Sequence, residues 1–328
     1  MRAAVLVESG KIQIKDVKPP EPGPGEVLIQ VMLAGICGTD HSLYNGKFDV
    51  ALPVIPGHEA IGRIEKLGPG VSDLEVGQRI TIQPNFACHQ CSLCRAGHEN
   101  ICSAKIRLGL DIDGVFAEYA KVPADYVWPV SQGLEDEVAV FTEPLAVAAH
   151  AMKIMAPRKG DRTLIFGTGV IGLLALELAA LKEAEVSACD INQTRLALAK
   201  KLGAADVIDT SDQTASQSNA FDLIYETSGA DSALAQAIQL AAPGGKIVIL
   251  GLPGKEHPVS PDLIVRKELQ IMGSMIYTDE FPEAINLLKS GQLQTEPLIS
   301  EKIPLDALDR ALSEFGTPNR VKMLVTIS

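Results

Sequence analysis

Hydrophobic and polar positions alternate in short runs over the first 145 residues, and each run ends at turn residues. Valine, isoleucine and leucine occupy every second position from 27 to 33, and similar runs cover 61–67 and 79–83. A period of two is typical of half-buried strands. The segment PPEPGPGE at 19–26 cannot form a helix or a central strand, because proline lacks the backbone donor. This part is therefore predicted to be mainly β, as a distorted barrel.

The pattern changes after residue 145, where apolar runs of strand length alternate with longer segments rich in leucine and alanine. This alternation predicts βαβ units and a parallel sheet, so the second part should have an α/β fold. The expected strands cover 162–166, 185–189, 221–225 and 246–250, and the expected helices cover 170–182, 194–202 and 233–241.

Length and composition limit the classes of protein. A chain of 328 residues exceeds the usual size of one hydrophobic core, so two domains are expected. The formal charge of −12 argues against nucleic acid or an anionic membrane as a partner and permits a small neutral substrate. Glu8 interrupts the N-terminal apolar run too early for a signal peptide, and the uncharged run 164–176 is too short to span a bilayer. These features favour a cytoplasmic protein.

Four cysteines stand close together in CHQCSLCRAGHENIC: Cys88, Cys91, Cys94 and Cys102. Gaps of two residues let neighbouring thiolates converge on one tetrahedral zinc ion. The alternative is an iron–sulfur cluster, but its bacterial run closes with a three-residue gap and a proline. Here the last gap is seven residues and Ser103 follows. Disulfides are disfavoured without a secretory signal. The prediction is a structural zinc, since four ligands leave no open position.

A glycine-rich motif, GTGVIG, follows the first expected strand of the α/β part and opens a helix. In dinucleotide-binding turns the three glycines permit the tight turn, the approach of the pyrophosphate and close helix packing, and the helix N-terminus favours the phosphates. Asp190 ends the next strand, where a carboxylate accepts hydrogen bonds from a ribose diol and repels a 2′-phosphate. A packing turn and a helix N-cap are the structural alternatives. The glycine-rich motif and Asp190 together predict that the chain binds NAD rather than NADP. The expected contacts with the cofactor are Gly167, Thr168, Gly169, Val170, Ile171, Gly172 and Asp190.

A third set of chemically suited residues is dispersed along the chain. Cys37 lies in GICGTD, His58 and Glu59 lie in PGHE, and Glu143 lies in TEPLAVAAH. Cysteine, histidine and a carboxylate are ligands that leave one zinc position open to substrate. Each residue alone also has a structural explanation, as a small core residue, a turn residue or a helix cap.

The motifs GICGTD, PGHEAIGRIEKLG, the four-cysteine lobe, EPLAVAAHA and GTGVIG, in this order, resemble those of zinc-dependent medium-chain dehydrogenases. The chain is most similar to the polyol (sorbitol-type) and threonine dehydrogenase branch. This resemblance implies a GroES-like catalytic domain over 1–145 with its zinc lobe at 85–105, and a Rossmann NAD-binding domain over 146–278. It also implies that 279–328 returns to complete the catalytic domain, and that the chain forms a homo-oligomer, either a tetramer or a dimer.

The resemblance assigns roles to individual residues. Cys37, His58 and Glu143 match the catalytic zinc ligands, Glu59 matches a neighbouring carboxylate that can approach the metal, and Thr39 matches the hydroxyl that passes on the substrate proton. The implied reaction is hydride transfer between a secondary alcohol, in particular a polyol, and NAD, with zinc as the Lewis acid. The remaining implied cofactor contacts are Arg195, Leu250, Gly251, Leu252 and Ser274.

One position departs from the family. Many members carry a histidine five residues after the ligand cysteine, as the outer end of a proton relay, but here that position is Ser42 and the histidine is His41. One residue turns a helical side chain by about 100°, so His41 is expected to face elsewhere.

Alternative functions remain to be weighed. A zinc-containing structural protein without turnover is disfavoured by the complete ligand set and the glycine motif. A zinc-independent quinone reductase of the same superfold is disfavoured by the four cysteines, which such enzymes lack. Threonine and short-chain diols remain alternative substrates, although Glu143 in EPLAV favours polyols.

Overall fold

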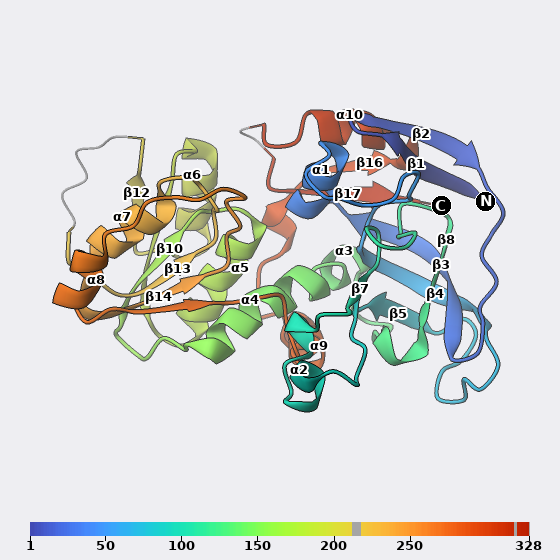
Figure 1. Ribbon diagram of the computed structural model, residues 1–328, viewed down its shortest axis with the longest axis horizontal. Coiled ribbons are helices and arrows are strands. Elements are labelled where there is room, and N and C mark those ends of the chain that lie inside the picture. Colours follow the sequence, from blue (N-terminus) through green and yellow to red (C-terminus); the bar gives the residue numbers. More distant parts are fainter. Residues whose placement is uncertain (212–217, 318–319, 328) are drawn as a thin grey trace. The chain divides into compact units, whose positions relative to one another are not determined.

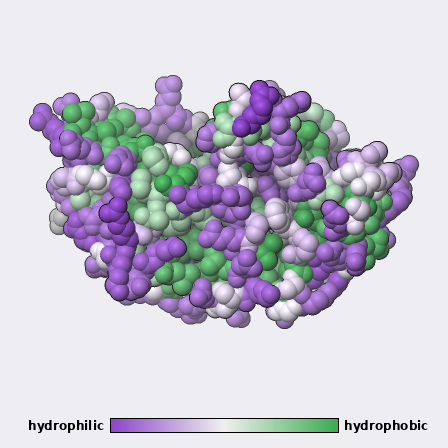
Figure 2. Space-filling view, turned by 90° about the horizontal axis from the view of Figure 1, so that it is seen from below, coloured by the Kyte–Doolittle hydropathy of each residue, from purple (hydrophilic) through white to green (hydrophobic). Residues whose placement is uncertain are grey.

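The computed structural model describes residues 1–211, 218–317 and 320–327, and the chain folds into two compact units (Figure 1). Unit 1 contains Met1–Glu143 and Phe281–Ser328, and unit 2 contains Pro144–Glu280. Within the described ranges, no helix is long and apolar enough to cross a membrane. Hydrophilic side chains cover most of the face shown in Figure 2, and hydrophobic ones form small patches between them.

Unit 1 is built on a seven-stranded sheet with the order β16-β17-β3-β4-β5-β9, and β8 also pairs with β3. The strand β3 is central because its residues are almost all buried and it contacts three partners. The described part of unit 1 also contains two small sheets, β1-β2 and β6-β7. The strands are β1 (Arg2–Glu8), β2 (Lys11–Asp16), β3 (Glu26–Gly35), β4 (Glu59–Leu67), β5 (Arg79–Ile82), β6 (Asn85–Phe86), β7 (Ile106–Arg107), β8 (Tyr119–Pro123), β9 (Val127–Pro129), β16 (Ile299–Pro304) and β17 (Lys322–Thr326).

Short helices flank this sheet and position the residues of interest. A longer helix, α4, begins in unit 1 and continues into unit 2. The C-terminal segment contributes β16 and β17 to the sheet of unit 1, so residues far apart in sequence share one core. The helices are α1 (Gly38–Tyr44), α2 (Ser92–Arg95), α3 (Asp136–Ala139), α4 (Thr142–Ile154), α9 (Phe281–Ser290) and α10 (Leu308–Ser313).

Unit 2 is a six-stranded parallel sheet with the order β12-β11-β10-β13-β14-β15. The chain forms the central strand β10 first, adds β11 and β12 on one side of it, and then adds β13, β14 and β15 on the other side. This is the strand order of dinucleotide-binding folds, which bind ligands where the order reverses. The elements are β10 (Arg162–Phe166), α5 (Val170–Leu181), β11 (Glu185–Asp190), α6 (Gln193–Lys201), β12 (Asp206–Asp209), β13 (Phe221–Glu226), α7 (Ala233–Leu240), β14 (Ala241–Ile249), α8 (Pro261–Arg266) and β15 (Gln270–Gly273).

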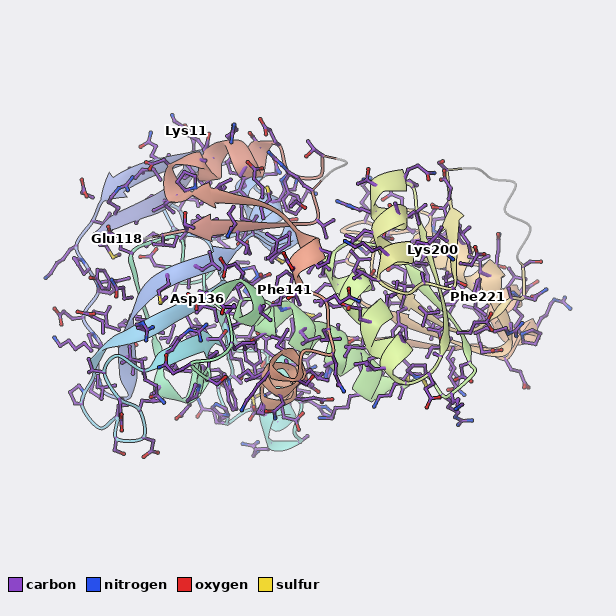
Figure 3. All side chains as sticks on the ribbon, turned by 180° about the vertical axis from the view of Figure 1, so that it is seen from behind. Lys11, Glu118, Asp136, Phe141, Lys200 and Phe221 are labelled. Atoms are coloured by element: carbon purple, nitrogen blue, oxygen red, sulfur yellow. The ribbon has the colours of Figure 1, made fainter. Side chains whose placement is uncertain are left out.

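The four strands and three helices predicted for unit 2 lie close to their expected positions, whereas β12, α8 and β15 were not predicted. The strand β14 begins at Ala241, directly after α7, whereas the sequence suggested a start at 246. Pro243 explains the early end of the helix, because proline disfavours helical geometry in the residue before it. Figure 3 labels Phe141 in unit 1 and Phe221 in unit 2, and both side chains are buried.

Candidate functional site

Three of the dispersed residues meet in unit 1. Cys37 follows β3 as the N-cap of α1, His58 precedes β4, and Glu59 is the first residue of β4. Strands β3 and β4 are antiparallel neighbours, and Gly35 pairs with Glu59. One donor atom from each residue lies within 4.8 Å of the other two. A thiolate, an imidazole and a carboxylate at this spacing fit a zinc ion with one position left open.

The turn before His58 is specified by glycine. Gly57 has φ +95°, and a Cβ there would approach the ring of Phe116 to 2.8 Å. Only glycine accepts this conformation without strain. The PGHE sequence therefore places His58 at the start of β4 beside Cys37.

Asp40 is a functional candidate that sequence reasoning missed. Its buried carboxylate accepts a hydrogen bond from the Cys37 N–H at 2.8 Å, and its Oδ1 lies 3.2 Å from Nδ1 of His58. Burial lowers the pKa of His58, but the charges of Asp40 and Cys37 outweigh burial and raise it. A carboxylate on Nδ1 orients the ring and leaves Nε2 for a ligand, as is usual for metal-binding histidines. The spacing of Cys37 and Asp40, three residues apart at a helix start, was the available signal.

The carboxylates of the site differ in their surroundings. Glu59 forms a buried ion pair with Lys322, which also donates to the backbone oxygen of Ile36 at 3.1 Å. Glu143 is buried at the start of α4 and lies outside the group of three donor atoms. Burial lowers the pKa of Lys322, but the charges of Glu59, Cys37 and Glu143 raise it above its ordinary value. Lys322 was missed because only the fold of unit 1 brings β17 to this site.

The residues around the proposed proton path lie on α1. Thr39 is partly exposed in the first turn, next to Cys37. The ring of His41 stacks on Phe315 at 4.9 Å between centroids, and its Nδ1 lies 3.0 Å from the backbone oxygen of Leu312. His41 therefore packs against α10, and its contacts lie outside the Cys37–His58–Glu59 group.

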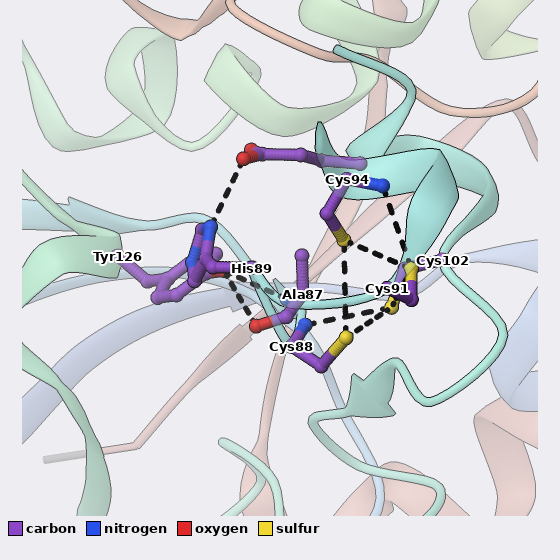
Figure 4. Close-up of polar contacts among 8 residues, drawn as sticks. Ala87, Cys88, His89, Cys91, Cys94, Cys102 and Tyr126 are labelled. Atoms are coloured by element: carbon purple, nitrogen blue, oxygen red, sulfur yellow. Dashed lines mark hydrogen bonds and ion pairs between the residues drawn. The ribbon is translucent and has the colours of Figure 1, made fainter. Parts of the chain in front are cut away.

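The four-cysteine lobe has the geometry of a closed metal site (Figure 4). The sulfur atoms of Cys91 and Cys94 lie 3.4 Å apart, as do those of Cys88 and Cys102. The pairs Cys88–Cys94 and Cys91–Cys102 are 3.9 Å apart. Four thiolates at 2.3 Å from a zinc ion are separated by about 3.8 Å. Hydrogen bonds from the backbone N–H and the thiol of Cys94 lower the pKa of Cys91 to about 6, which favours the thiolate that a metal needs.

A hydrogen-bond network ties this lobe to the core of unit 1. The hydroxyl of Tyr126 accepts from the Ala87 N–H at 2.7 Å and contacts Nε2 of His89 at 2.9 Å. The other ring nitrogen of His89 lies 2.9 Å from Glu99 (Figure 4). Burial raises the pKa of Tyr126 to about 12, so its hydroxyl remains a neutral partner.

Unit 2 contains a cavity of about 330 Å³ at the carboxyl ends of β10, β11 and β13. Its wall includes Gly167, Gly169, Asp190 and Arg195. Strands β10 and β13 are the neighbours between which the strand order reverses, so the cavity lies where this fold binds nucleotides.

The three glycines of GTGVIG have separate structural reasons. Gly167 has φ +97°, and a Cβ on Gly172 would come within 1.9 Å of the Gly167 oxygen. In contrast, the space beside Gly169, the N-cap of α5, is open. The first turn of α5, with Val170 and Ile171, thus presents its backbone N–H groups to an unobstructed approach, which fits a pyrophosphate.

Asp190 is held in place by three hydrogen bonds. Its Oδ2 accepts from the backbone N–H and the hydroxyl of Thr168, at 2.7 and 2.8 Å, and its Oδ1 accepts from the N–H of Asn192 at 3.0 Å. Two of the bonds come from the glycine-rich turn itself. The carboxylate is therefore fixed at the cavity wall beside that turn.

The remaining expected cofactor residues follow β14 and β15. The N–H groups of Leu250 and Gly251 donate to the Glu226 oxygen, and the Ser274 N–H donates to Ile249 at 2.8 Å. Leu252 is 81% exposed. None of these four residues belongs to the wall of the cavity beside Asp190.

Comparison with known proteins agrees with this geometry. Residues 23–132 match the model of the alcohol dehydrogenase GroES-like domain, and residues 170–290 match that of zinc-binding dehydrogenases. A sorbitol dehydrogenase of Bacillus subtilis is 33% identical, over 95% of this chain and 94% of the relative. An L-threonine 3-dehydrogenase of Pyrococcus horikoshii is 36% identical, over 88% of this chain and 87% of the relative.

A solved structure shares the whole architecture. A zinc-binding dehydrogenase from Sinorhizobium meliloti, bound to NADP, superposes with a TM-score of 0.95 at 34% identity, over 99% of this chain and 98% of the other. The fold and the two sites define a zinc-dependent oxidoreductase that uses a nicotinamide nucleotide. The chain belongs to the zinc-binding alcohol dehydrogenase family, which confirms the fold class and the resemblance inferred from its motifs.

Proposed function

We propose that the chain oxidises a secondary alcohol of the polyol class with NAD, at a zinc ion held by Cys37, His58 and Glu59. The observation that carries the proposal is the convergence of these three donor atoms within 4.8 Å. A bound zinc ion would act as a Lewis acid on the substrate oxygen. Glu143, buried at the start of α4, adds a further carboxylate near this group. Its EPLAV context favours polyols as substrates.

The chain's own residues supply the remaining functions. Thr39, on the first turn of α1, passes the hydroxyl proton away from the substrate. Asp40 orients His58, while the glycine-rich turn and the α5 N-terminus hold the pyrophosphate. Arg195, Leu250, Gly251, Leu252 and Ser274 complete the proposed cofactor contacts.

The preference for NAD rests on Asp190 at the cavity wall. Its carboxylate would accept a ribose hydroxyl and would repel the 2′-phosphate of NADP. The Sinorhizobium relative is bound to NADP, so the preference is proposed from this chain's own carboxylate.

We further propose one catalytic zinc and one structural zinc per chain, with the second ion in the four-cysteine lobe. We propose a reducing compartment such as the cytoplasm, because zinc-binding thiolates must stay reduced. A homo-oligomer, tetramer or dimer, is expected from the family, and light scattering of the purified protein would establish it.

A substrate screen tests the function. Purified protein is given NAD or NADP with sugar alcohols, short diols, simple secondary alcohols or threonine, and formation of the reduced nucleotide is followed. We expect NAD reduction with at least one sugar alcohol. Threonine is the second candidate substrate, because one relative is an L-threonine 3-dehydrogenase. Reduction of the nucleotide with threonine alone would overturn the polyol assignment.

A further inference from the structure

A buried ion pair in unit 1 spans three adjacent strands. Lys322 is the first residue of β17, Glu59 is the first residue of β4, and β3 lies between these two strands. Gly35 of β3 pairs with Leu324 on one side and with Glu59 on the other. Both charged side chains are almost completely buried, with 2% and 1% exposure. The lysine therefore reaches Glu59 across the central strand.

The central strand provides the space for this pair by having no side chain at the crossing point. A Cβ on Gly35 would lie 2.2 Å from Oε2 of Glu59 and 2.8 Å from Cε of Lys322. The second partner of the Lys322 ammonium is the backbone oxygen of Ile36, at 3.1 Å. The ammonium is thus held by the residue that follows Gly35 as well as by Glu59.

The charges of the site explain why a buried lysine is needed. Cys37 as a thiolate, with Asp40, Glu59 and Glu143 as carboxylates, brings four negative charges into a buried region. A divalent zinc ion would offset two of them, and Lys322 offsets a third. An uncompensated buried charge is strongly destabilising.

We propose that Lys322 is a positioning residue, which fixes Glu59 as a metal ligand and offsets part of the negative charge of the zinc centre. The contact with Lys322 engages Oε2 of Glu59 and leaves Oε1 available as the ligand atom. The proposal rests on the zinc centre proposed above, and it adds a fourth residue, from the C-terminal segment, to the three ligands.

The test compares three variants of the full-length protein. Lys322→Met removes the charge at similar length, Lys322→Arg keeps the charge, and the double variant Lys322→Met/Glu59→Gln removes the pair together. Lys302→Met is the matched control, because Lys302 lies on the neighbouring strand β16 and pairs with Glu137 while half-exposed. For each protein, zinc affinity is measured by competition with a chelator, and the visible spectrum is recorded after cobalt replaces the catalytic zinc.

Lys322→Met should weaken zinc binding at the centre by about 10- to 100-fold, the usual effect of removing a group that orients a ligand. Its cobalt spectrum should change, since the geometry at Glu59 is released. Lys322→Arg should recover most of the affinity, and the double variant should bind zinc no more tightly than Lys322→Met alone, because it also lacks the Glu59 carboxylate. Lys302→Met should match the wild type.

The outcomes separate this inference from the proposed function. A folded Lys322→Met protein with wild-type affinity and an unchanged cobalt spectrum would overturn the inference alone. If Lys322→Met does not fold, the folding of the double variant decides: a folded double variant supports the charge argument, and an unfolded one shows a packing role instead. A wild-type chain that binds zinc only in the cysteine lobe would overturn the proposed function and this inference together.

Discussion

At the scale of single residues, Asp190 has two tasks in the nucleotide cavity. It closes the glycine-rich turn through its hydrogen bonds with Thr168, and we propose that it also selects NAD. Its position at the end of β11 was predictable from the spacing to Gly172. The contact with Thr168 was not, because the distance between two loops depends on the strand order of the sheet.

Replacing Asp190 by alanine should weaken NAD binding and reduce the discrimination against NADP. The lost hydrogen bond to a charged group is worth about 1.5–3 kcal/mol, or about a tenfold to hundredfold change in NAD affinity. Dissociation constants for both nucleotides give the answer. Asp222→Ala is the control, since Asp222 binds Arg162 elsewhere in unit 2. Equal use of both nucleotides by the wild type would refute the selection by Asp190.

The proton relay gives a second prediction at this scale. Thr39→Val should lower alcohol oxidation by about 10²-fold or more, because proton transfer by a positioned group contributes about 10²–10⁴-fold. Ser42→Ala and His41→Ala should each cost less than tenfold, because water can replace an outer relay group and His41 packs on Phe315. Profiles of rate against pH for the three variants separate these effects. A large loss in His41→Ala that is recovered at high pH would place His41 in the relay.

At the scale of elements, the cysteine lobe is an irregular segment between β6 and β8 with little secondary structure of its own. Its shape depends on the metal and on the Tyr126–His89–Glu99 network. The cysteine spacing alone predicted the convergence of the four sulfurs. The network could not be predicted from the sequence, because Tyr126 lies outside the cysteine motif and is brought to the lobe only by the fold.

Cys94→Ser and Cys37→Ser should therefore affect different properties, the first stability and the second turnover. Cys94→Ser should lower the melting temperature or prevent folding, because metal binding in a closed cysteine site contributes directly to folding. Cys37→Ser should keep the fold and NAD affinity but lower turnover by orders of magnitude. Thermal unfolding, NAD titration and steady-state rates check both variants. A fully stable and active Cys94→Ser protein would contradict the structural role of the lobe.

A hydrogen-bonded contact also connects α4 to the segment before α9. Nδ1 of His150 lies 2.9 Å from Glu280, which also accepts from the Thr278 N–H at 2.6 Å. Burial raises the pKa of Glu280, but the hydrogen bonds from His150 and Thr278 outweigh it and lower the pKa to about 2. An unfolded glutamate has a pKa of about 4.3. Because the folded pKa is the lower one, Glu280 stabilises the protein above about pH 4, and this contribution is lost as the pH falls toward 2.

Glu280→Gln should consequently lower the melting temperature at neutral pH. The difference from the wild type should shrink as the pH is lowered from about 4 toward 2. Glu283→Gln serves as the control, because Glu283 is exposed on α9 nearby. Melting curves over this pH range provide the measurement, and a difference that stays constant with pH would argue against an ionised Glu280 in the link.

At the scale of the whole molecule, the two proposed zinc ions differ in how many ligands the chain supplies. The lobe offers four sulfur atoms, whereas Cys37, His58 and Glu59 leave one position open. The fold class and the ligand types followed from the sequence, because motif order and periodicity are local signals. The roles of Lys322 and Asp40 could not be predicted, because a lysine in an apolar strand or an aspartate at a helix start fits several roles. Only the assembled sheet brings these two residues to the site.

Metal-replete protein should contain two zinc ions per chain. Gradual chelation should abolish activity before the protein unfolds, because the open site exchanges its ligand while the four-cysteine site is closed. Elemental analysis and melting curves on the same samples measure both effects. One zinc or fewer per chain, or simultaneous loss of activity and structure, would contradict the two-site arrangement.

The split composition of unit 1 has a consequence for synthesis on the ribosome. Unit 2, Pro144–Glu280, is continuous and can fold as soon as it has emerged, whereas unit 1 also needs Phe281–Ser328. Until β17 arrives, the Leu33–Gly35 end of β3 has an unpaired edge in the nascent chain, open to association with other strands, whereas β8 pairs with the first half of β3. Lys322 is made after all the proposed ligands, so the proposed zinc centre can be completed only after the segment Phe281–Ser328 has emerged.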